Sequence, residues 1–534
     1  MKELSLVSRN YKVLFLSLTF ICVPIISFLV LSGDLFEHTI WWAVVFTGII
    51  VTGVLLFIKS KANRIYMVFA FVSIAIVLIV SVSKYTLEMN NVSALGKDLG
   101  EIRHSFSGYV QRQDVKAGEN MYISITGVDG QLLKKEVMAY GRNYSGHHFE
   151  QGSYIEFSGI FNELGKEGKN QMTNWLTSRG VYCSIEGISD ILTDFYRDEK
   201  SVVLSFKNKI NNALAESLYF IPHKEDYERA VFLSRGILFG DKSAFESDIM
   251  ECFKKSGITH LLCVSGLHFS IMLSSLKLIL RKFIRNKRIV ALVLIVVAIF
   301  YLSMCGFTKS AVRAGIMALL AATGIKSQRK HSGVLGILMA VWIICTFDVN
   351  SVYDTGFHMS VLACAGIICS QHFADKVQTN MTGHKVIAYI FEVVFMSLGA
   401  FSFVSLYTLF CFGGASTVSV LATAAAIIPA QIYLILCWSS SFLGIMGIRC
   451  FDMLISVILS FVSNIIYEVA RFFSELKFSY VTAELPGFEI IYFFVILLLL
   501  GYCWASRFRC ACLHFIMVSL SVFSVCGILL MNMV

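Results

Sequence analysis

Long apolar segments alternate with short charged ones over most of this chain. Tyr11–Ser32, Thr39–Ile58 and Ile65–Ser83 each have about the ~20 residues that a helix needs to cross a bilayer. From Ile258 onward further apolar segments follow, several of them shorter and interrupted by glycines. The pattern predicts a three-helix membrane anchor over residues 1–83 and a multi-helix membrane domain over residues 258–534, about thirteen spans in all. Short segments beside glycines are typical of broken or re-entrant helices that line a protein-enclosed cavity.

The charges between these segments predict an orientation. Lys2 and Arg9 precede the first segment and Lys12 stands at its start, and basic residues also join the second segment to the third. The positive-inside rule therefore puts the N-terminus in the cytoplasm and the segment after the third helix outside. A hydrophobic content of 56% excludes a soluble protein and predicts a multi-pass membrane protein.

One long polar segment, residues 84–200, has the alternation of β-strands. Asp129-Gly130 is a strong hairpin signal between two of them. The expected strands are Glu101–Gln113, Asn120–Thr126, Gln131–Tyr140, Ser153–Phe161 and Val181–Glu186, with a helix at Gln171–Arg179. Five short strands and a helix favour an OB-type β-barrel. The predicted fold class is a polytopic α-helical membrane protein with an inserted extracellular β (OB-like) domain.

The charge of this segment weakens a role as a nucleic-acid clamp. It holds 13 basic and 16 acidic residues, so that its net charge is −3. Tyr122, Tyr154 and Phe157 are therefore expected to be core or surface aromatics, not platforms for bases. A local basic patch remains open, and its candidate members are Arg112, Lys134, Lys135 and Arg142.

Residues 201–257 are expected to connect the barrel to the membrane domain. Ser201–Phe239 mixes apolar and charged residues at helical spacing, which predicts two interfacial or capping helices. An outer loop, Gly240–Gly257, is expected to couple the two parts, beginning with Gly240, Asp241 and Lys242. Its carboxylates alternate with lysines, which favours a solvated helix-capping loop over a metal site.

Polar residues stand inside the apolar run Ile258–Leu280. They are His260, Ser265, Gly266 and His268. On one continuous helix Ser265 and His268 share a face, and His260 lies two turns earlier near the same face. Three interpretations remain open: hydrogen bonds between packed helices, a polar pore, and a serine nucleophile with a histidine base.

Arg313 is the most informative single charge, and Lys309 and Ser310 precede it by one turn. A charge at the membrane centre costs at least ~2.5 kcal/mol, so it must be paired or solvated. Asp354 and Glu392 are the candidate ion-pair partners. One interpretation is a structural ion pair, and the other is a pair of cations that attracts phosphates at the outer mouth of a path.

Three stretches agree in order with the signature of a known family. The first contains Gly240-Asp241-Lys242, Gly257–Leu262 (GITHLL) and Ser265–His268 (SGLH). The second is Gly306–Met317, and the third is Asp354–Ala363. Together they resemble the ComEC/Rec2 family of competence proteins over roughly residues 80 to 440. That resemblance implies passage of single-stranded DNA across the cytoplasmic membrane during natural transformation. The resemblance also adds Gly356, His358 and Ser360 to the residues predicted to line the substrate path. His358 stands at a position where the family usually has glutamine. Gly266 and Gly356 are expected to permit close helix packing.

The resemblance also implies that other proteins supply the nuclease and the motor. The sequence contains neither the HxHxDH-type cluster of the family's metallo-β-lactamase-like domain nor a Walker A pattern. We therefore expect a short form that is not an enzyme and has no cofactor. Its expected partners are single-stranded DNA, membrane lipids, a DNA receptor, a cytoplasmic motor, a separate nuclease and a second copy of itself. The alternatives are an intramembrane serine hydrolase that uses Ser265, and a small-molecule or lipid transporter.

Overall fold

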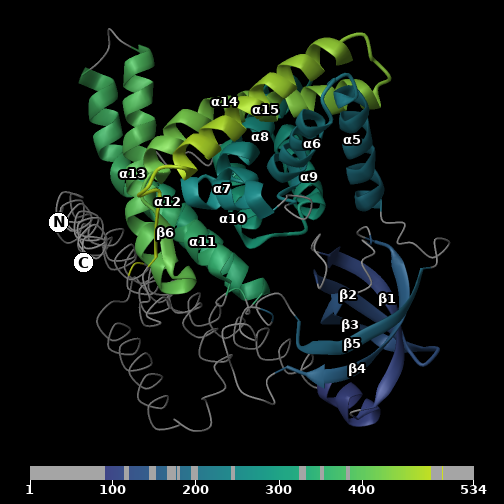
Figure 1. The fold of residues 1–534 in the computed structure, drawn as a ribbon. Coiled ribbons are helices and arrows are strands. Elements are labelled where there is room, and N and C mark those ends of the chain that lie inside the picture. Colours follow the sequence, from purple (N-terminus) through teal and green to yellow (C-terminus); the bar gives the residue numbers. More distant parts are fainter. Residues whose placement is uncertain are drawn as a thin grey trace, which may run out of the picture.

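The computed structural model describes a barrel followed by a helical part (Figure 1). The described residues are 91–100, 102–113, 119–143, 149, 152–164, 176, 181–193, 202–241, 247–323, 332–348, 351, 354–380, 385–482 and 496. The predicted three-helix anchor of residues 1–83 lies outside these residues, as does the part of the predicted membrane domain after residue 482, apart from Ile496. So does the predicted helix Gln171–Arg179, apart from Leu176.

Five strands form a closed barrel in the order β1-β2-β3-β5-β4, which confirms the OB-like domain. They are β1 Arg103–Gln113, β2 Glu119–Val128, β3 Gln131–Asn143, β4 Tyr154–Glu163 and β5 Cys183–Thr193. Only β3 and β5 pair in parallel; the other neighbours are antiparallel. The β2–β3 hairpin turns at Asp129 and Gly130 with φ values of 49° and 78°, because a right-handed strand twist favours turns with positive φ.

The barrel core takes its residues from alternate positions of the strands. Phe106, Ile123 and Ile125 are fully buried in it. Tyr154 and Phe157 are also buried, and Tyr122 packs against Tyr140. Phe157 belongs to the core of the barrel, whereas Tyr122 lies in a separate cluster with Tyr140, Leu176 and Val181. All three aromatics are buried, as expected of core residues, and present no open face to a base.

The helical part contains the helices α5 to α15 and a short two-stranded sheet. Two of the helices precede the coupling segment, and they match the pair predicted over Ser201–Phe239. The helices are α5 Val202–Leu218, α6 Lys224–Phe239, α7 Ser247–Ser256, the 3₁₀ helix η3 Thr259–Leu262, α8 Gly266–Phe283, α9 Lys287–Met304, α10 Lys309–Thr323, α11 Ser332–Phe347, α12 Thr355–Asn380, α13 Lys385–Phe412, α14 Ser419–Ile445 and α15 Asp452–Ser474. The strands β6 Gly414–Ser416 and β7 Tyr480–Thr482 pair antiparallel.

Four of the described helices are long and apolar enough to cross a bilayer. They are α9, most of α13 (Ile387–Phe412), α14 and α15. Many of their apolar side chains are exposed on the outside of the fold, as lipid contact requires. The chain is therefore a polytopic α-helical membrane protein with an inserted β-barrel domain.

The helical part has two separate apolar cores. The larger joins α5–α10 with α14 and α15, and the smaller joins α11, α12 and α13. Val312 of α10 packs against both, so α10 lies on the seam between them. In the smaller core α12 and α13 approach closely at Gly366 and Gly399, where a Cβ on Gly366 would lie 2.1 Å from the carbonyl oxygen of Gly399.

Candidate functional site

The first polar stretch lies at a break between two helices. The 3₁₀ helix η3 ends at Leu262, Cys263 is extended, and α8 begins at Gly266. The single continuous helix expected over Ile258–Leu280 is therefore wrong. Because the chain changes direction between His260 and His268, the shared helical face predicted for the two histidines does not exist.

Ser265 and His268 form a capping box at the start of α8. The Ser265 hydroxyl accepts from the backbone N–H of His268 at 3.4 Å, and the Nδ1 of His268 accepts from the backbone N–H of Ser265 at 3.3 Å. Together they satisfy two of the backbone donors that a helix start leaves unpaired. This contact uses Nδ1 of His268 on the backbone, so the imidazole does not hold the Ser265 hydroxyl through that nitrogen.

The residues just before the break lie close to β6 and the start of α14. His260 is exposed, and its Nδ1 lies 3.1 Å from the carbonyl oxygen of Gly257. Gly257 has a φ of +76°, and a Cβ there would meet Ser416 and Ser419 at 2.8 and 2.5 Å. Only glycine fits both the backbone conformation and the space. The glycine thus lets the turn between α7 and η3 approach β6 and the start of α14.

Arg313 is almost fully buried on α10, with 6% of its surface exposed. Its Nε donates to the Ser360 hydroxyl of α12 at 2.7 Å, and Nη1 contacts Met317 Sδ at 3.6 Å and the thiol of Cys364. The predicted ion pairs with Asp354 and Glu392 are not formed. Within the described part of the chain the guanidinium has only neutral partners, so no carboxylate among these residues compensates its charge.

The other cation of α10 does have a carboxylate partner. Lys309 forms a salt bridge with Asp348, which follows the end of α11. Both side chains are largely shielded from solvent. Ser310 is half-buried beside it. Asp348 is not among the partners predicted from the sequence, where its one signal is its place as a lone acid directly after an apolar run.

Helix α12 carries the third group of predicted residues. Asp354 caps it by accepting from the N–H of Phe357 at 2.8 Å, which explains why this carboxylate is not available to Arg313. His358 is 1% exposed, and its Nδ1 lies 2.6 Å from the hydroxyl of Tyr407 on α13. Ser360 lies on the same helix and reaches α10 instead.

Gly356 and Gly266 do not provide the close packing expected of them. A Cβ on Gly266 would meet nothing within 4 Å, and one on Gly356 would meet only Asp354, two residues away. The close contacts are made by Gly257, by Gly366 with Gly399, and by Gly315 against Leu302. A glycine pattern in an apolar sequence does not reveal which glycine faces a neighbour.

The predicted coupling segment is mostly helical. Gly240 ends α6 in the left-handed conformation, with a φ of 72°, and Asp241 donates its backbone N–H to the carbonyl of Arg235. Lys242 lies outside the described residues. From Ser247 the segment forms α7, where Lys255 pairs with Glu251 at 2.8 Å. The described residues hold no group of three His, Cys, Asp or Glu side chains placed to bind a metal.

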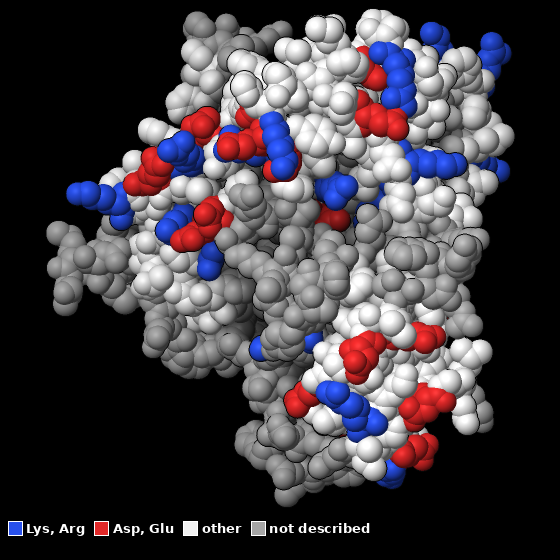
Figure 2. Space-filling view, turned by 45° about the vertical axis from the view of Figure 1, so that its right-hand side comes forward, with Lys and Arg blue, Asp and Glu red and all other residues white. Residues whose placement is uncertain are grey.

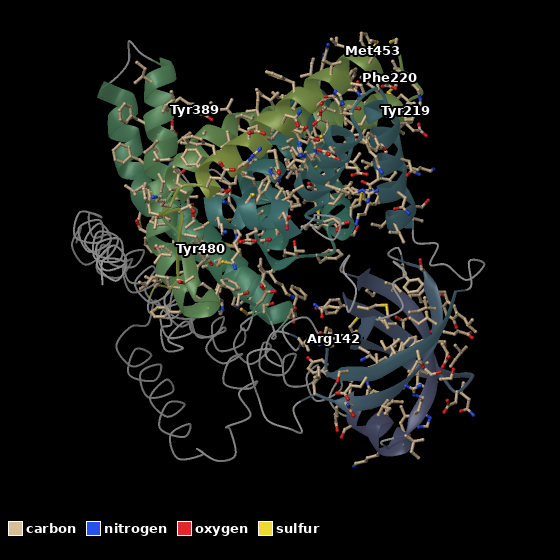
Figure 3. The ribbon with its side chains drawn as sticks, viewed as in Figure 1. Arg142, Tyr219, Phe220, Tyr389, Met453 and Tyr480 are labelled. Atoms are coloured by element: carbon tan, nitrogen blue, oxygen red, sulfur yellow. The ribbon has the colours of Figure 1, made fainter. Side chains whose placement is uncertain are left out.

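The predicted site residues therefore fall into separate groups. Arg313 and Ser360 meet on the seam between the two cores, His358 bonds within the smaller core, and Ser265 with His268 caps α8. No recorded contact joins Arg313 to either His260 or His268 in the part of the chain that the structure describes. On the barrel, Lys135 and Arg142 are exposed, and Figure 3 shows Arg142 at the edge of the barrel that faces the helices. On the face of the barrel that Figure 2 shows, acidic side chains form several patches around a smaller basic one.

These features define a class, a multi-pass membrane protein with a barrel and with charged and polar groups buried between its helices. The model of the competence protein family matches residues 237–508, which include η3, α8, α10 and α12. This chain belongs to the competence protein family.

Comparison with curated proteins gives a weaker likeness. The chain is similar to ComE operon protein 3 of Bacillus subtilis (strain 168), with 23% identity over 159 residues. The aligned part is 30% of this chain and only 20% of that protein. No solved structure matches the chain significantly.

Proposed function

We propose that this protein conducts single-stranded DNA across the cytoplasmic membrane during natural transformation. Its membership of the competence protein family supports DNA uptake as the process. The proposed orientation has the N-terminus in the cytoplasm and the barrel outside, as the basic residues around the first predicted spans favour. A DNA receptor, a cytoplasmic motor and a separate nuclease are proposed as partners.

The observation that carries the proposal is the environment of Arg313. A guanidinium is always charged, and burying it without a carboxylate is costly. Here its described partners are a hydroxyl, a thiol and a thioether. A buried cation without a carboxylate partner among the described residues favours an anionic ligand, and guanidinium groups bind phosphate oxygens in a bidentate fork. Helix α10 lies on the seam between the two apolar cores. A path for the strand opens there when the two cores separate.

The test compares substitutions at two arginines in the source bacterium, with the natural copy deleted. Arg313→Met removes the charge, and Arg313→Lys keeps it without the fork. The matched control is Arg449→Met, because Arg449 is half-exposed and pairs with Glu216 at the surface. We expect Arg313→Met to lower transformation frequency at least about tenfold, the equivalent of one interaction of about 1.4 kcal/mol. Arg313→Lys should fall in between, and the control should transform normally.

Protein amount must be equal for this comparison, so membrane levels are measured by immunoblot. Normal transformation by Arg313→Met at normal protein levels would contradict the proposed role of Arg313. Normal transformation of the deletion strain itself would contradict the whole function. In that case export or import of a small molecule or lipid becomes the alternative to pursue.

A further inference from the structure

A dense group of cations surrounds the turn between α8 and α9. We call residues 277–288 (KLILRKFIRNKR) the basic connection. It contains six Lys or Arg residues and no Asp or Glu. Five of the six side chains are exposed: Arg281, Lys282, Arg285, Lys287 and Arg288. No salt bridge is formed by these five within the described part of the chain.

Several exposed cations elsewhere in the helical part are paired with carboxylates. Lys224 pairs with Glu228, Lys255 with Glu251, and Arg471 with Glu475, each one helical turn away. Such pairs reduce the net charge of a surface. The basic connection has no such neighbours, so its positive charge is available to an external anion.

Large apolar side chains are exposed among these cations. Leu278 is 73% exposed and Phe283 is 77% exposed, and Ile279 lies next to them. The exposed apolar surface continues on α9, where Ile289, Leu292, Val296 and Ile299 recur at helical spacing. Helix α9 is one of the candidate spans and begins at Lys287. The apolar stripe therefore faces lipid, and the cations lie at the end of the span, at the level of the headgroups.

We propose that the basic connection binds the headgroups of anionic phospholipids, while Leu278, Ile279 and Phe283 enter the boundary of the acyl chains. Cations directly beside a span attract anionic lipids, and apolar side chains between them add to the affinity. A single-stranded nucleic acid is the other common polyanion. It would need aromatic faces on which bases stack, and this segment has one aromatic residue, placed beside a lipid-facing stripe.

The experiment uses the full chain reconstituted into nanodiscs of phosphatidylcholine with a minor fraction of phosphatidylglycerol. Native mass spectrometry counts the phosphatidylglycerol that stays on the protein after release from the disc. The test variant is R281Q/K282Q/R285Q/R288Q. The control is K97Q/K135Q/K209Q/K477Q, which removes four cations that are also exposed. We expect the test variant to lose phosphatidylglycerol several-fold, and the control to retain as much as the natural protein.

Two further measurements test whether the basic connection binds lipid through its charge. Retention by the natural protein should fall as salt rises, because screening weakens exposed charges, and this needs no variant. Binding of a labelled single-stranded oligonucleotide is measured in discs of phosphatidylcholine alone. Equal retention of phosphatidylglycerol by the test variant and the natural protein, or retention that salt does not change, would overturn the proposal. Loss of oligonucleotide binding with unchanged lipid retention would assign the surface to nucleic acid.

Discussion

Arg313 of α10 donates a hydrogen bond to the hydroxyl of Ser360 on α12, and this contact crosses the seam between the two apolar cores. The two residues are 47 positions apart in the sequence. A serine hydroxyl satisfies a guanidinium donor but does not neutralise its charge. The arrangement thus positions a cation whose described partners leave its charge and positive potential in place.

Placing a carboxylate beside Arg313 tests whether that potential matters. Ser360→Asp should form an ion pair with Arg313 and remove the attraction for phosphate. We expect transformation frequency to fall at least about tenfold, while the melting temperature of the purified protein stays within a few degrees of the natural value or rises. Ser360→Asn is the matched control, because it has nearly the same size and keeps a hydrogen-bond acceptor without a charge. Equal transformation by both variants would show that the charge of Arg313 is not used.

The capping box at Ser265 allows a structural role to be separated from a catalytic one. Ser265→Ala removes the acceptor for the N–H of His268 and should destabilise the start of α8 by about 0.5–2 kcal/mol. Ser265→Asp should restore the cap, since aspartate is also a preferred N-cap residue. The measurement is the melting temperature in detergent together with transformation frequency.

A serine hydrolase makes the opposite prediction for the second variant. If Ser265 were a nucleophile, Ser265→Asp would be as inactive as Ser265→Ala, because neither side chain carries the attacking hydroxyl. Recovery of both stability and transformation by Ser265→Asp supports the cap and excludes the hydrolase. Recovery of stability alone would support the hydrolase.

The sequence predicted the barrel well because its signals are local. Alternation and the Asp129-Gly130 turn together determine the register of β2 and β3, and four observed strands begin and end near the expected positions. The exception is β5, which was expected to end at Glu186 and continues to Thr193. The apolar run Ile289–Cys305 between charged loops likewise predicts a helix, and α9 is observed over Lys287–Met304. A uniform apolar run between charged loops leaves few alternatives.

The contacts of the candidate site could not be predicted in this way. The break before α8 lies inside a continuous apolar run without proline, and its one local signal was Ser265 three residues before His268, where a capping box usually has Glu or Gln. The partners of Arg313 and Lys309 depend on how α10, α11 and α12 pack. Asp354 was the expected partner of Arg313, but a local helix cap satisfies it first.

The contact between Gly366 and Gly399 predicts a sharp difference between two Gly→Ala substitutions. Gly366→Ala would place a methyl group against the backbone of α13, and backbone cannot move aside as a side chain can. We expect a loss of about 1–3 kcal/mol in stability, seen as a lower melting temperature. Gly266→Ala is the matched control, because a Cβ there meets nothing and alanine favours the helix. Similar melting temperatures for the two variants would contradict the close approach of α12 and α13.

The ion pair between His104 and Asp129 makes the barrel sensitive to pH. Nδ1 of His104 lies 2.6 Å from the Asp129 carboxylate, and Nε2 lies 2.9 Å from the carbonyl oxygen of Leu99. Both partners are acceptors, so the ring donates twice only when it is protonated. The hydrogen bond to Asp129, followed by that to Leu99, raises the pKa of His104 above its ordinary value of 6.5. The backbone N–H of Ser105, followed by His104, lowers the pKa of Asp129 below its ordinary value of 3.8.

The direction of each shift determines where the barrel is most stable. A raised pKa for His104 means that its contribution is complete below about pH 6.5 and is lost as pH rises through the folded value. A lowered pKa for Asp129 means that its contribution is complete above about pH 4 and is lost as pH falls. We therefore expect hydrogen exchange of residues 99–130 in the full chain, corrected for intrinsic rates, to be slowest near pH 5–6 and faster near pH 8. His104→Asn, which stays neutral, should abolish the difference between pH 6 and pH 8. Persistence of the same difference in that variant would mean that another group governs it.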